Sequence, residues 1–456
     1  MKPRLQRLLT LLALLVALPG WAQQERALTD KQKTELAESV EEILQFIEKG
    51  TGLKPKQPIE RAFVDRAGLR AHIEKNSSEE DAARVRRSEL VLKRFGLLPR
   101  DFDLRKFSVE LGVDRIAGYY DTKKKVVYLL DFKPVVQQKP ILAHELTHAL
   151  QDQHYGITEW AKAIAEEKPE MPDDGLTAVL AAEESAFARR AVVEGQANVV
   201  LVEYALQAAR EWAGPWALRG QSMWRAPVLM SLVEPGSESP LYKSAPVALK
   251  ESMAFPYTFG YGFVRALLDK RGATLAYEEV MRKPPSTSRH IMFPATYLRE
   301  EELPEVRLPD LREALDGKYR RLNAGTMGAF DAYVLGKHFD GEGMADKLAK
   351  RWRGGVHYAA VPAGLKDEEL QPGQVWLLYL SRWDSEKSAR DFAKQYGKWM
   401  RNRYEQLTAT GEAQWETEDG PVSIEVRGDD VLVMEGFAPE IASRVRSAVW
   451  QGITPP

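Results

Sequence analysis

The sequence of 456 residues contains no cysteine and only seven histidines. The lack of cysteine excludes a disulfide framework, a thiolate zinc site and a cysteine nucleophile. The sequence also has no large surplus of charge of either sign. It contains 64 lysines and arginines and 66 aspartates and glutamates, which gives a formal net charge of −2. No basic field is therefore available to bind nucleic acid. Any metal ion must be bound by histidine and carboxylate side chains.

Long apolar runs are scarce, and the one that matters lies at the N-terminus. Lys2, Arg4 and Arg7 precede an uncharged, leucine-rich run over residues 8–18, and Gly20-Trp21-Ala22 follows it. This order predicts a secretory signal peptide over residues 1–22, and its run is shorter than a membrane span. No cysteine follows that could carry a lipid anchor. We expect a secreted or periplasmic protein without a membrane span after signal removal, and more acidic once the three cations are removed.

Periodicity and composition divide the rest of the chain into three regions. We expect an N-terminal helical region over residues 23–105, a core over residues 106–322 and a small α+β domain over residues 323–456. The expected fold class is therefore α+β, with a mainly helical core and a small edge sheet. Whether residues 23–105 form a propeptide, what the C-terminal domain does and how many chains assemble stay open at this level.

Apolar residues at helical spacing predict helices, and short β-type runs predict strands. Helices are expected over residues 29–50, 78–95, 140–153, 175–212, 261–270, 385–401 and 439–449. Strands are expected over residues 107–113, 126–130 and 375–380. A turn near Asp121 joins the first two strands into a hairpin, and residues 322–328 mark a domain boundary.

The helix that begins near residue 140 contains His144-Glu145-Leu146-Thr147-His148. Residues four positions apart lie only about 40° apart around a helix, so both imidazoles can bind one ion. Glu145 lies beside them, placed to accept a proton from water on that ion rather than to bind it. This pattern predicts His144 and His148 as zinc ligands and Glu145 as the catalytic base.

A third ligand is needed, and the sequence offers two candidates. His154 lies ten positions after His144, but it would reach the ion only if the helix broke at Gln151, where glycine is normally required. Glu194 lies in an apolar helix, where a carboxylate without a cationic partner is costly. Gly195 beside it would let another helix approach closely. We favour Glu194, which gives a Zn²⁺ site of two histidines and one glutamate with a fourth position open.

Three further polar residues are candidates for orienting these ligands. Arg190 and Asn198 lie one turn on either side of Glu194, and Asp152 lies one turn beyond His148. Such neighbours can hold a ligating carboxylate or imidazole in place. The sequence leaves open whether Asp152 orients a ligand or only forms a polar helix end.

The run HELTHALQDQ at residues 144–153, with EGQA at residues 194–197, resembles the gluzincin, thermolysin-like branch of zinc metallopeptidases. More narrowly, it is similar to a group of secreted bacterial proteins that share HELTHALQDQ and an E-G-x-A helix. The similarity continues through residues 255–264, 284–288 and 294–297, and so covers roughly residues 115–300. It implies a zincin-like core, zinc at His144, His148 and Glu194, and catalysis by Glu145.

The chain departs from that group at one position. The group usually has His-Pro where this sequence has Phe293-Pro294, and a histidine stands three residues earlier, at His290. If the family histidine binds substrate or stabilises the oxyanion, another group must do so here. Tyr257, Tyr261 and His290 are the candidates.

Together these residues predict a secreted zinc metallopeptidase that hydrolyses peptide bonds in a peptide or protein substrate. The hairpin before the metal helix, with Tyr119 and Tyr120, would offer a strand edge for an extended peptide. One alternative is a catalytically idle relative that acts as a binding or scaffold protein of the cell envelope. Another is a zinc hydrolase that acts on a non-protein amide or ester. The motif specifies how water is activated and not what is cut, so the substrate stays open.

Overall fold

The computed structural model describes residues 27–75, 79–132, 135–162, 167–168, 170–208 and 239–453. The expected signal peptide, residues 1–22, lies outside the described residues, as does the end of the helix expected over residues 175–212. Within these ranges no helix combines the length and the apolar character needed to cross a bilayer. The chain is a mixed α+β protein, as the sequence predicts.

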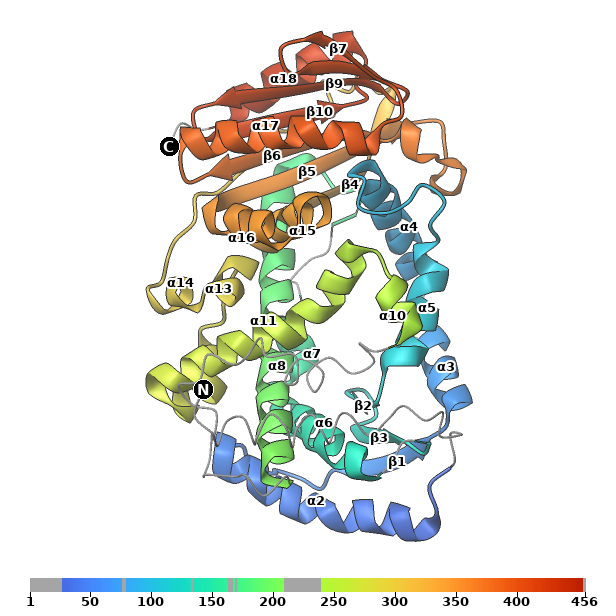
Figure 1. Ribbon diagram of the computed structural model, residues 1–456, viewed down its shortest axis with the longest axis vertical. Coiled ribbons are helices and arrows are strands. Elements are labelled where there is room, and N and C mark those ends of the chain that lie inside the picture. Colours follow the sequence, from blue (N-terminus) through green and yellow to red (C-terminus); the bar gives the residue numbers. More distant parts are fainter. Residues whose placement is uncertain are drawn as a thin grey trace.

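The first two thirds of the chain are mainly helical and contain a small sheet (Figure 1). The sheet has the order β1-β3-β2, with β3 parallel to β1 and antiparallel to β2. Its elements, in chain order, are α2 (Asp30–Thr51), β1 (Glu60–Val64), α3 (Arg66–Lys75), α4 (Glu79–Arg94), α5 (Leu104–Arg115), β2 (Gly118–Asp121), β3 (Val126–Leu130), α6 (Val135–Tyr155), α7 (Ile157–Trp160), η1 (Asp173–Gly175), α8 (Leu176–Ala208), α10 (Pro240–Ser244), α11 (Val247–Arg271), η2 (Leu275–Glu279), α12 (Val280–Arg282), α13 (Ser288–Met292) and α14 (Pro294–Leu298).

The C-terminal part is built on an antiparallel sheet of seven strands, in the order β4-β5-β6-β10-β9-β8-β7. The first strand, β4, begins at Tyr319, so the expected boundary at residues 322–328 lies within or just after this strand. The elements are β4 (Tyr319–Thr326), α15 (Ala329–Asp340), α16 (Glu342–Arg351), β5 (Trp352–Pro362), η3 (Asp367–Glu369), η4 (Pro372–Gln374), β6 (Trp376–Trp383), α17 (Glu386–Arg403), β7 (Leu407–Gly411), β8 (Gln414–Thr417), β9 (Gly420–Arg427), β10 (Asp430–Glu435) and α18 (Pro439–Gly452).

Helix α8 connects the two parts of the molecule. Its 33 residues rise about 50 Å, and Figure 1 shows it running from beside α6 to the C-terminal sheet. Near its start, Leu176 and Leu180 belong to the apolar cluster under that sheet. Near its end, Val200 and Tyr204 belong to the cluster that joins α2 and α6. The middle of α8 therefore has a fixed position between two cores.

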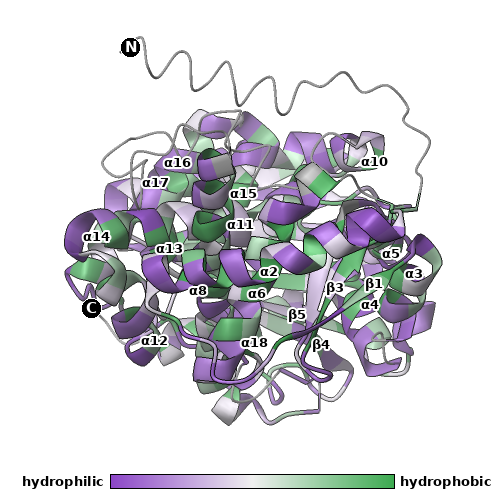
Figure 2. Cartoon of the chain, turned by 90° about the horizontal axis from the view of Figure 1, so that it is seen from below, coloured by the Kyte–Doolittle hydropathy of each residue, from purple (hydrophilic) through white to green (hydrophobic). Residues whose placement is uncertain are grey.

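Helix α2 covers the side of α6 that faces away from the histidines. Thr29 caps α2 through a capping box with Gln32, and Gly52 ends it with a left-handed backbone. Leu36, Ile43 and other apolar residues of α2 pack in one cluster with Leu142, Leu146 and Leu150 of α6. Seen from below in Figure 2, α2 lies in front of α6 and shows mainly hydrophilic residues to solvent.

One strand expected from the sequence is wrong. Residues 107–113 alternate apolar and polar side chains, but they lie inside helix α5. Asp103 caps this helix by accepting a hydrogen bond from the Lys106 amide at 2.9 Å. Leu104 and Leu111, seven positions apart, are both buried on it. The hairpin itself exists, but its first strand is β2, Gly118–Asp121, paired with β3.

Two prolines, Pro140 and Pro256, lie inside helices, and the sequence analysis expected the first helix to begin at Pro140. Helix α6 starts at Val135, five residues before Pro140, and α11 starts at Val247, well before the expected start at residue 261. An internal proline removes one backbone hydrogen bond. Around Pro256, burial of Phe255 and Phe259 in the main core offsets this loss.

Candidate metal centre

Helices α6 and α8 bring three ligand-type side chains together. His144 and His148 on α6 and Glu194 on α8 place their ligand atoms within 4.8 Å of one another. Oε2 of Glu194 lies 3.4 Å from Nε2 of each histidine, and the two Nε2 atoms are 3.0 Å apart. Atoms bound to one tetrahedral zinc ion at 2.0–2.1 Å lie roughly 3.3 Å apart. The three side chains therefore have the spacing of three corners of such a site, so they could hold a metal ion.

The electrostatics of this group favour a positive charge at its centre. Oε2 of Glu194 is buried and has no hydrogen-bond donor among the described residues. Burial alone would raise the pKa of Glu194, but His148 and His144 outweigh it and hold that pKa well below its usual range. Burial opposes a charged His148, yet Glu194 raises the pKa of His148 to about 9. A metal dication would supply this positive charge without a proton.

Two glycines bring helices α8 and α11 into contact beside Glu194. A Cβ atom at Gly195 would overlap the carbonyl oxygen of Gly260 on α11, and one at Gly260 would overlap the carbonyl oxygen of Ala191. Any larger residue at either position would push the helices apart. The glycine of EGQA thus fixes the depth at which Glu194 enters the site.

Glu145 lies next to the three ligand-type residues without joining them. Burial raises the pKa of its carboxyl, and the imidazoles of His144 and His148 partly oppose this shift. The backbone amide of Tyr120 in β2 donates a hydrogen bond to the carboxylate. Gly118 makes room for this arrangement, because a Cβ atom there would lie 2.9 Å from Ile141 and 3.5 Å from Cγ of Glu145.

A cavity of about 370 Å³ opens beside His144 and Glu145. Four elements contribute to it: the segment from α5 to β2, and helices α6, α8 and α11. Its wall is mostly apolar, and Asn198, Ser252 and Tyr257 are the polar residues besides the two site residues. A substrate group in this cavity would lie against the side chains that carry the candidate chemistry.

The other candidates near the metal centre have different positions. His154 lies away from the group and hydrogen-bonds the Lys54 carbonyl through Nε2 at 2.8 Å. Asp152 accepts hydrogen bonds from the Tyr120 hydroxyl at 2.9 Å and from Lys125, so it ties the hairpin to α6. Neither residue orients the three ligand-type side chains directly.

The residues on either side of Glu194 also differ. Asn198 donates to the Tyr257 carbonyl at 3.2 Å and lines the cavity, whereas Arg190 is exposed on α8. Asn198 therefore fixes the part of α11 that faces His144, rather than the Glu194 carboxylate.

Of the three candidates for oxyanion stabilisation, the structure places one at the cavity. The ring of Tyr257 lies 6.5 Å from that of His144 and lines the cavity. Tyr261 is buried in the main core, 2% exposed. Both ring nitrogens of His290 are engaged, Nδ1 by the Ser286 amide at 3.3 Å and Nε2 by the Glu301 carbonyl at 3.2 Å. Phe293 packs against the Arg289 guanidinium and does not line the cavity.

Two glutamines that were not predicted from the sequence lie behind the site, and one of them contacts His148. Oε1 of Gln151 is 2.9 Å from Nδ1 of His148, and the side-chain amide of Gln151 donates to Oε1 of Gln196 at 2.7 Å. Both glutamines are fully buried. The only signal in the sequence is that Gln151 stands in HELTHALQDQ and Gln196 in EGQA, where a buried amide needs hydrogen-bond partners.

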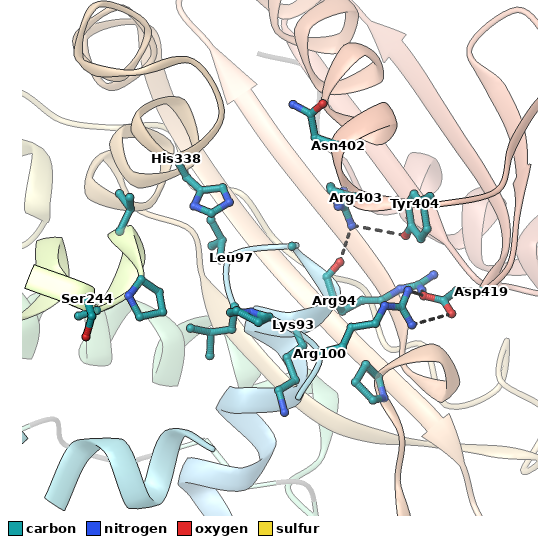
Figure 3. Close-up of a pocket in the computed structure, with 17 residues that line it drawn as sticks. Lys93, Arg94, Leu97, Arg100, Ser244, His338, Asn402, Arg403, Tyr404 and Asp419 are labelled. Carbon is teal, nitrogen blue, oxygen red and sulfur yellow. Dashed lines mark hydrogen bonds and ion pairs between the residues drawn. The ribbon is translucent and has the colours of Figure 1, made fainter. Parts of the chain in front are cut away.

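A larger cavity of about 560 Å³ lies elsewhere, between the α4–α5 connection, the start of α11 and the C-terminal part (Figure 3). Its four cations are Lys93, Arg94, Arg100 and Arg403. Asp419 pairs with Arg94 and Arg100, while Glu89 pairs with Lys93 and Glu435 with Arg403. These charges are compensated within the protein. No second group of metal-ligand type is found in the part of the chain that the structure describes.

Comparison with known families gives one match, and it lies outside the candidate metal centre. A family model described as a domain of unknown function (DUF8575) matches residues 320–446, which are nearly the whole seven-stranded sheet with its helices. Comparison with curated proteins and with solved structures gives no match. The matched residues include none of His144, Glu145, His148 and Glu194.

Proposed function

We propose that this protein is an exported, zinc-dependent metallopeptidase of the gluzincin type. His144, His148 and Glu194 would bind the ion, and Glu145 would act as general base. The observation that carries the proposal is the tetrahedral spacing of the three ligand atoms, with a buried carboxylate oxygen of Glu194 that has no hydrogen-bond donor among the described residues. Two imidazoles and one carboxylate are a ligand set of catalytic zinc sites, which keep a fourth position open.

Zinc bound there would supply Lewis acidity, which polarises a substrate carbonyl and lets water lose a proton near neutral pH. Glu145 would accept that proton and pass it to the leaving amine. The Tyr120 amide holds the Glu145 carboxylate in place, and the burial that raises its pKa suits a group that must carry the proton between the two steps.

The substrate would lie in the cavity beside Glu145. The backbone of Ala117 and Gly118, at the entrance to edge strand β2, lines this cavity and offers hydrogen-bonding groups to an extended peptide. Tyr257 is the side chain placed to contact the substrate carbonyl, because it alone of the three aromatic candidates lines the cavity.

The direct test is digestion of an unbiased peptide library by the zinc-loaded protein, read by mass spectrometry. We expect the wild type to cleave peptide bonds and Glu145→Gln to lose about 10²–10⁴-fold in rate, because general-base catalysis contributes that much. Glu145→Gln should keep its zinc, since this residue is not a ligand.

The matched control is Glu159→Gln, which neutralises an exposed carboxylate on α7 and should leave cleavage unchanged. Full zinc occupancy with no peptide cleaved under any condition would contradict the peptidase proposal. It would favour the idle relative or the hydrolase of a non-protein amide or ester.

A further inference from the structure

A chain of buried amides lies behind the metal centre and ends on two backbone carbonyls. The Gln151 amide nitrogen donates to the carbonyl of Val193 at 3.1 Å and to Oε1 of Gln196 at 2.7 Å. The Gln196 amide nitrogen donates to the carbonyl of Ala276 at 2.6 Å. Both glutamine side chains are 0% exposed, so water cannot replace these partners.

The two carbonyls fix the orientation of both amides. A backbone carbonyl only accepts, so Gln196 must turn its NH₂ group to Ala276 and its oxygen to Gln151. Gln151 must then turn its NH₂ group to Val193 and Gln196, which leaves its oxygen facing Nδ1 of His148 at 2.9 Å. If either amide were reversed, two acceptors or two donors would face each other.

We infer that Gln151, held by Gln196, is a positioning residue that sets the tautomer of His148 and ties this ligand to the helix that carries Glu194. An oxygen facing Nδ1 requires the proton on that nitrogen, so the lone pair of neutral His148 lies on Nε2, which faces Glu194. The same amide bonds the carbonyl of Val193, the residue before Glu194. One side chain thereby fixes two of the three ligands relative to each other.

The two histidines differ in this respect. Nδ1 of His144 is buried and has no hydrogen-bond partner among the described residues, whereas Nδ1 of His148 has Gln151. The inference rests on the proposed zinc site, but it concerns how the protein prepares the site rather than the reaction. It predicts that zinc affinity depends on residues that touch neither the ion nor the substrate.

The test measures zinc affinity by competition with a chelator for wild type, Gln151→Leu and Gln196→Leu. Loss of such an orienting partner typically weakens metal binding about 10–100-fold. We expect that loss in Gln151→Leu and a smaller loss in the same direction in Gln196→Leu. The matched control is Gln153→Leu on the same helix. Oε1 of Gln153 accepts a hydrogen bond from the Lys56 amide at 2.8 Å, and this residue is not part of the chain of amides formed by Gln151 and Gln196, here called the relay. It should bind zinc as the wild type does.

A second readout separates positioning from general loss of structure. In zinc-bound protein labelled with ¹⁵N-histidine, the Nδ1 proton of His148 should exchange slowly in wild type and Gln153→Leu and quickly in Gln151→Leu. Zinc affinity of Gln151→Leu within about twofold of wild type, or an equal loss in Gln153→Leu, would overturn the inference. If the wild type bound no zinc, the proposed function would fail. The relay would then be read from the His148 tautomer in metal-free protein at about pH 10, where imidazole is neutral.

Discussion

Two glutamates, the buried Glu435 in the C-terminal part and the half-buried Glu194 in the candidate metal centre, differ in how their charges are compensated. Glu435 accepts hydrogen bonds from Arg403 at 2.7 and 2.9 Å and from the hydroxyls of Tyr396 and Tyr404. Glu194 faces two imidazoles at 3.4 Å with an oxygen that has no donor among the described residues. Arginine side chains of the protein compensate the first carboxylate, whereas the second faces only imidazoles, at the place where the proposed metal ion would lie.

Replacement of Glu435, whose charge is compensated within the protein, gives the largest expected effect on stability. Glu435→Gln leaves the buried guanidinium of Arg403 without an anionic partner, while Arg94 close to it keeps its ion pair with Asp419. Breaking a buried ion pair in this way costs about 3–5 kcal/mol. Urea denaturation of the metal-free protein should show this loss, while zinc affinity stays as in wild type. Equal stability of Glu435→Gln and wild type would remove the distinction between the two glutamates.

A change at the helix crossing tests how Glu194 is placed. Gly195→Ala puts a methyl group where the Gly260 carbonyl lies, so α8 and α11 must separate. Overpacking of this kind costs about 1–3 kcal/mol, and we expect zinc affinity to fall as well because Glu194 moves.

The control for this change is Gly343→Ala on α16, where an added methyl group meets nothing within 4 Å. Its free energy of unfolding should stay within about 0.5 kcal/mol of wild type. Unchanged zinc binding in Gly195→Ala would show that the crossing does not position the ligand.

A pH-dependent effect is expected where α8 meets the C-terminal part. Burial, and then the carboxylate of Glu184 on α8, raise the pKa of Asp331 to about 7, and the Tyr379 hydroxyl on β6 also faces it. The folded protein therefore holds a proton that the unfolded chain releases near pH 3.8. This contribution to stability is complete below about pH 4 and is lost as the pH rises towards 7.

Asp331→Asn should flatten this part of the stability profile, because an amide does not titrate. Urea denaturation at about pH 5 and about pH 8 measures the difference between variant and wild type. Asp101→Asn, which changes an exposed aspartate, should follow the wild-type profile. Parallel profiles for Asp331→Asn and wild type would show that the proton on Asp331 does not contribute.

The candidate ligands could be predicted because their arrangement depends on local geometry. His144 and His148 lie on the same face of any α-helix, because they are four positions apart. A glutamate in an apolar helix needs a polar or charged partner in any fold. For the other candidates, tertiary contacts decide whether they lie at the site. His154 bonds Lys54, Tyr261 enters the core and His290 is held by Ser286 and Glu301.

Other features could not be predicted, because they depend on contacts between distant segments. The alternating pattern at residues 107–113 fits a strand as well as a helix. The Asp103 cap and the burial of Leu104 and Leu111 favour the helix, and both are visible only in the folded structure. Helix α11 begins at Val247, well before the expected start at residue 261, and the packing of Phe255 and Phe259 around Pro256 supports this earlier start. The Gln151–Gln196 relay spans α6, α8 and the π-helical segment η2, and no spacing within one helix indicates it.

The central claim is that His144, His148 and Glu194 bind one zinc ion. Equilibrium dialysis against zinc followed by elemental analysis tests it most directly, on wild type, Glu194→Gln and His154→Gln. We predict one zinc per chain in wild type and His154→Gln, and none in Glu194→Gln at the same free zinc concentration. Full occupancy in Glu194→Gln together with loss in His154→Gln, or no zinc in the wild type, would contradict the account.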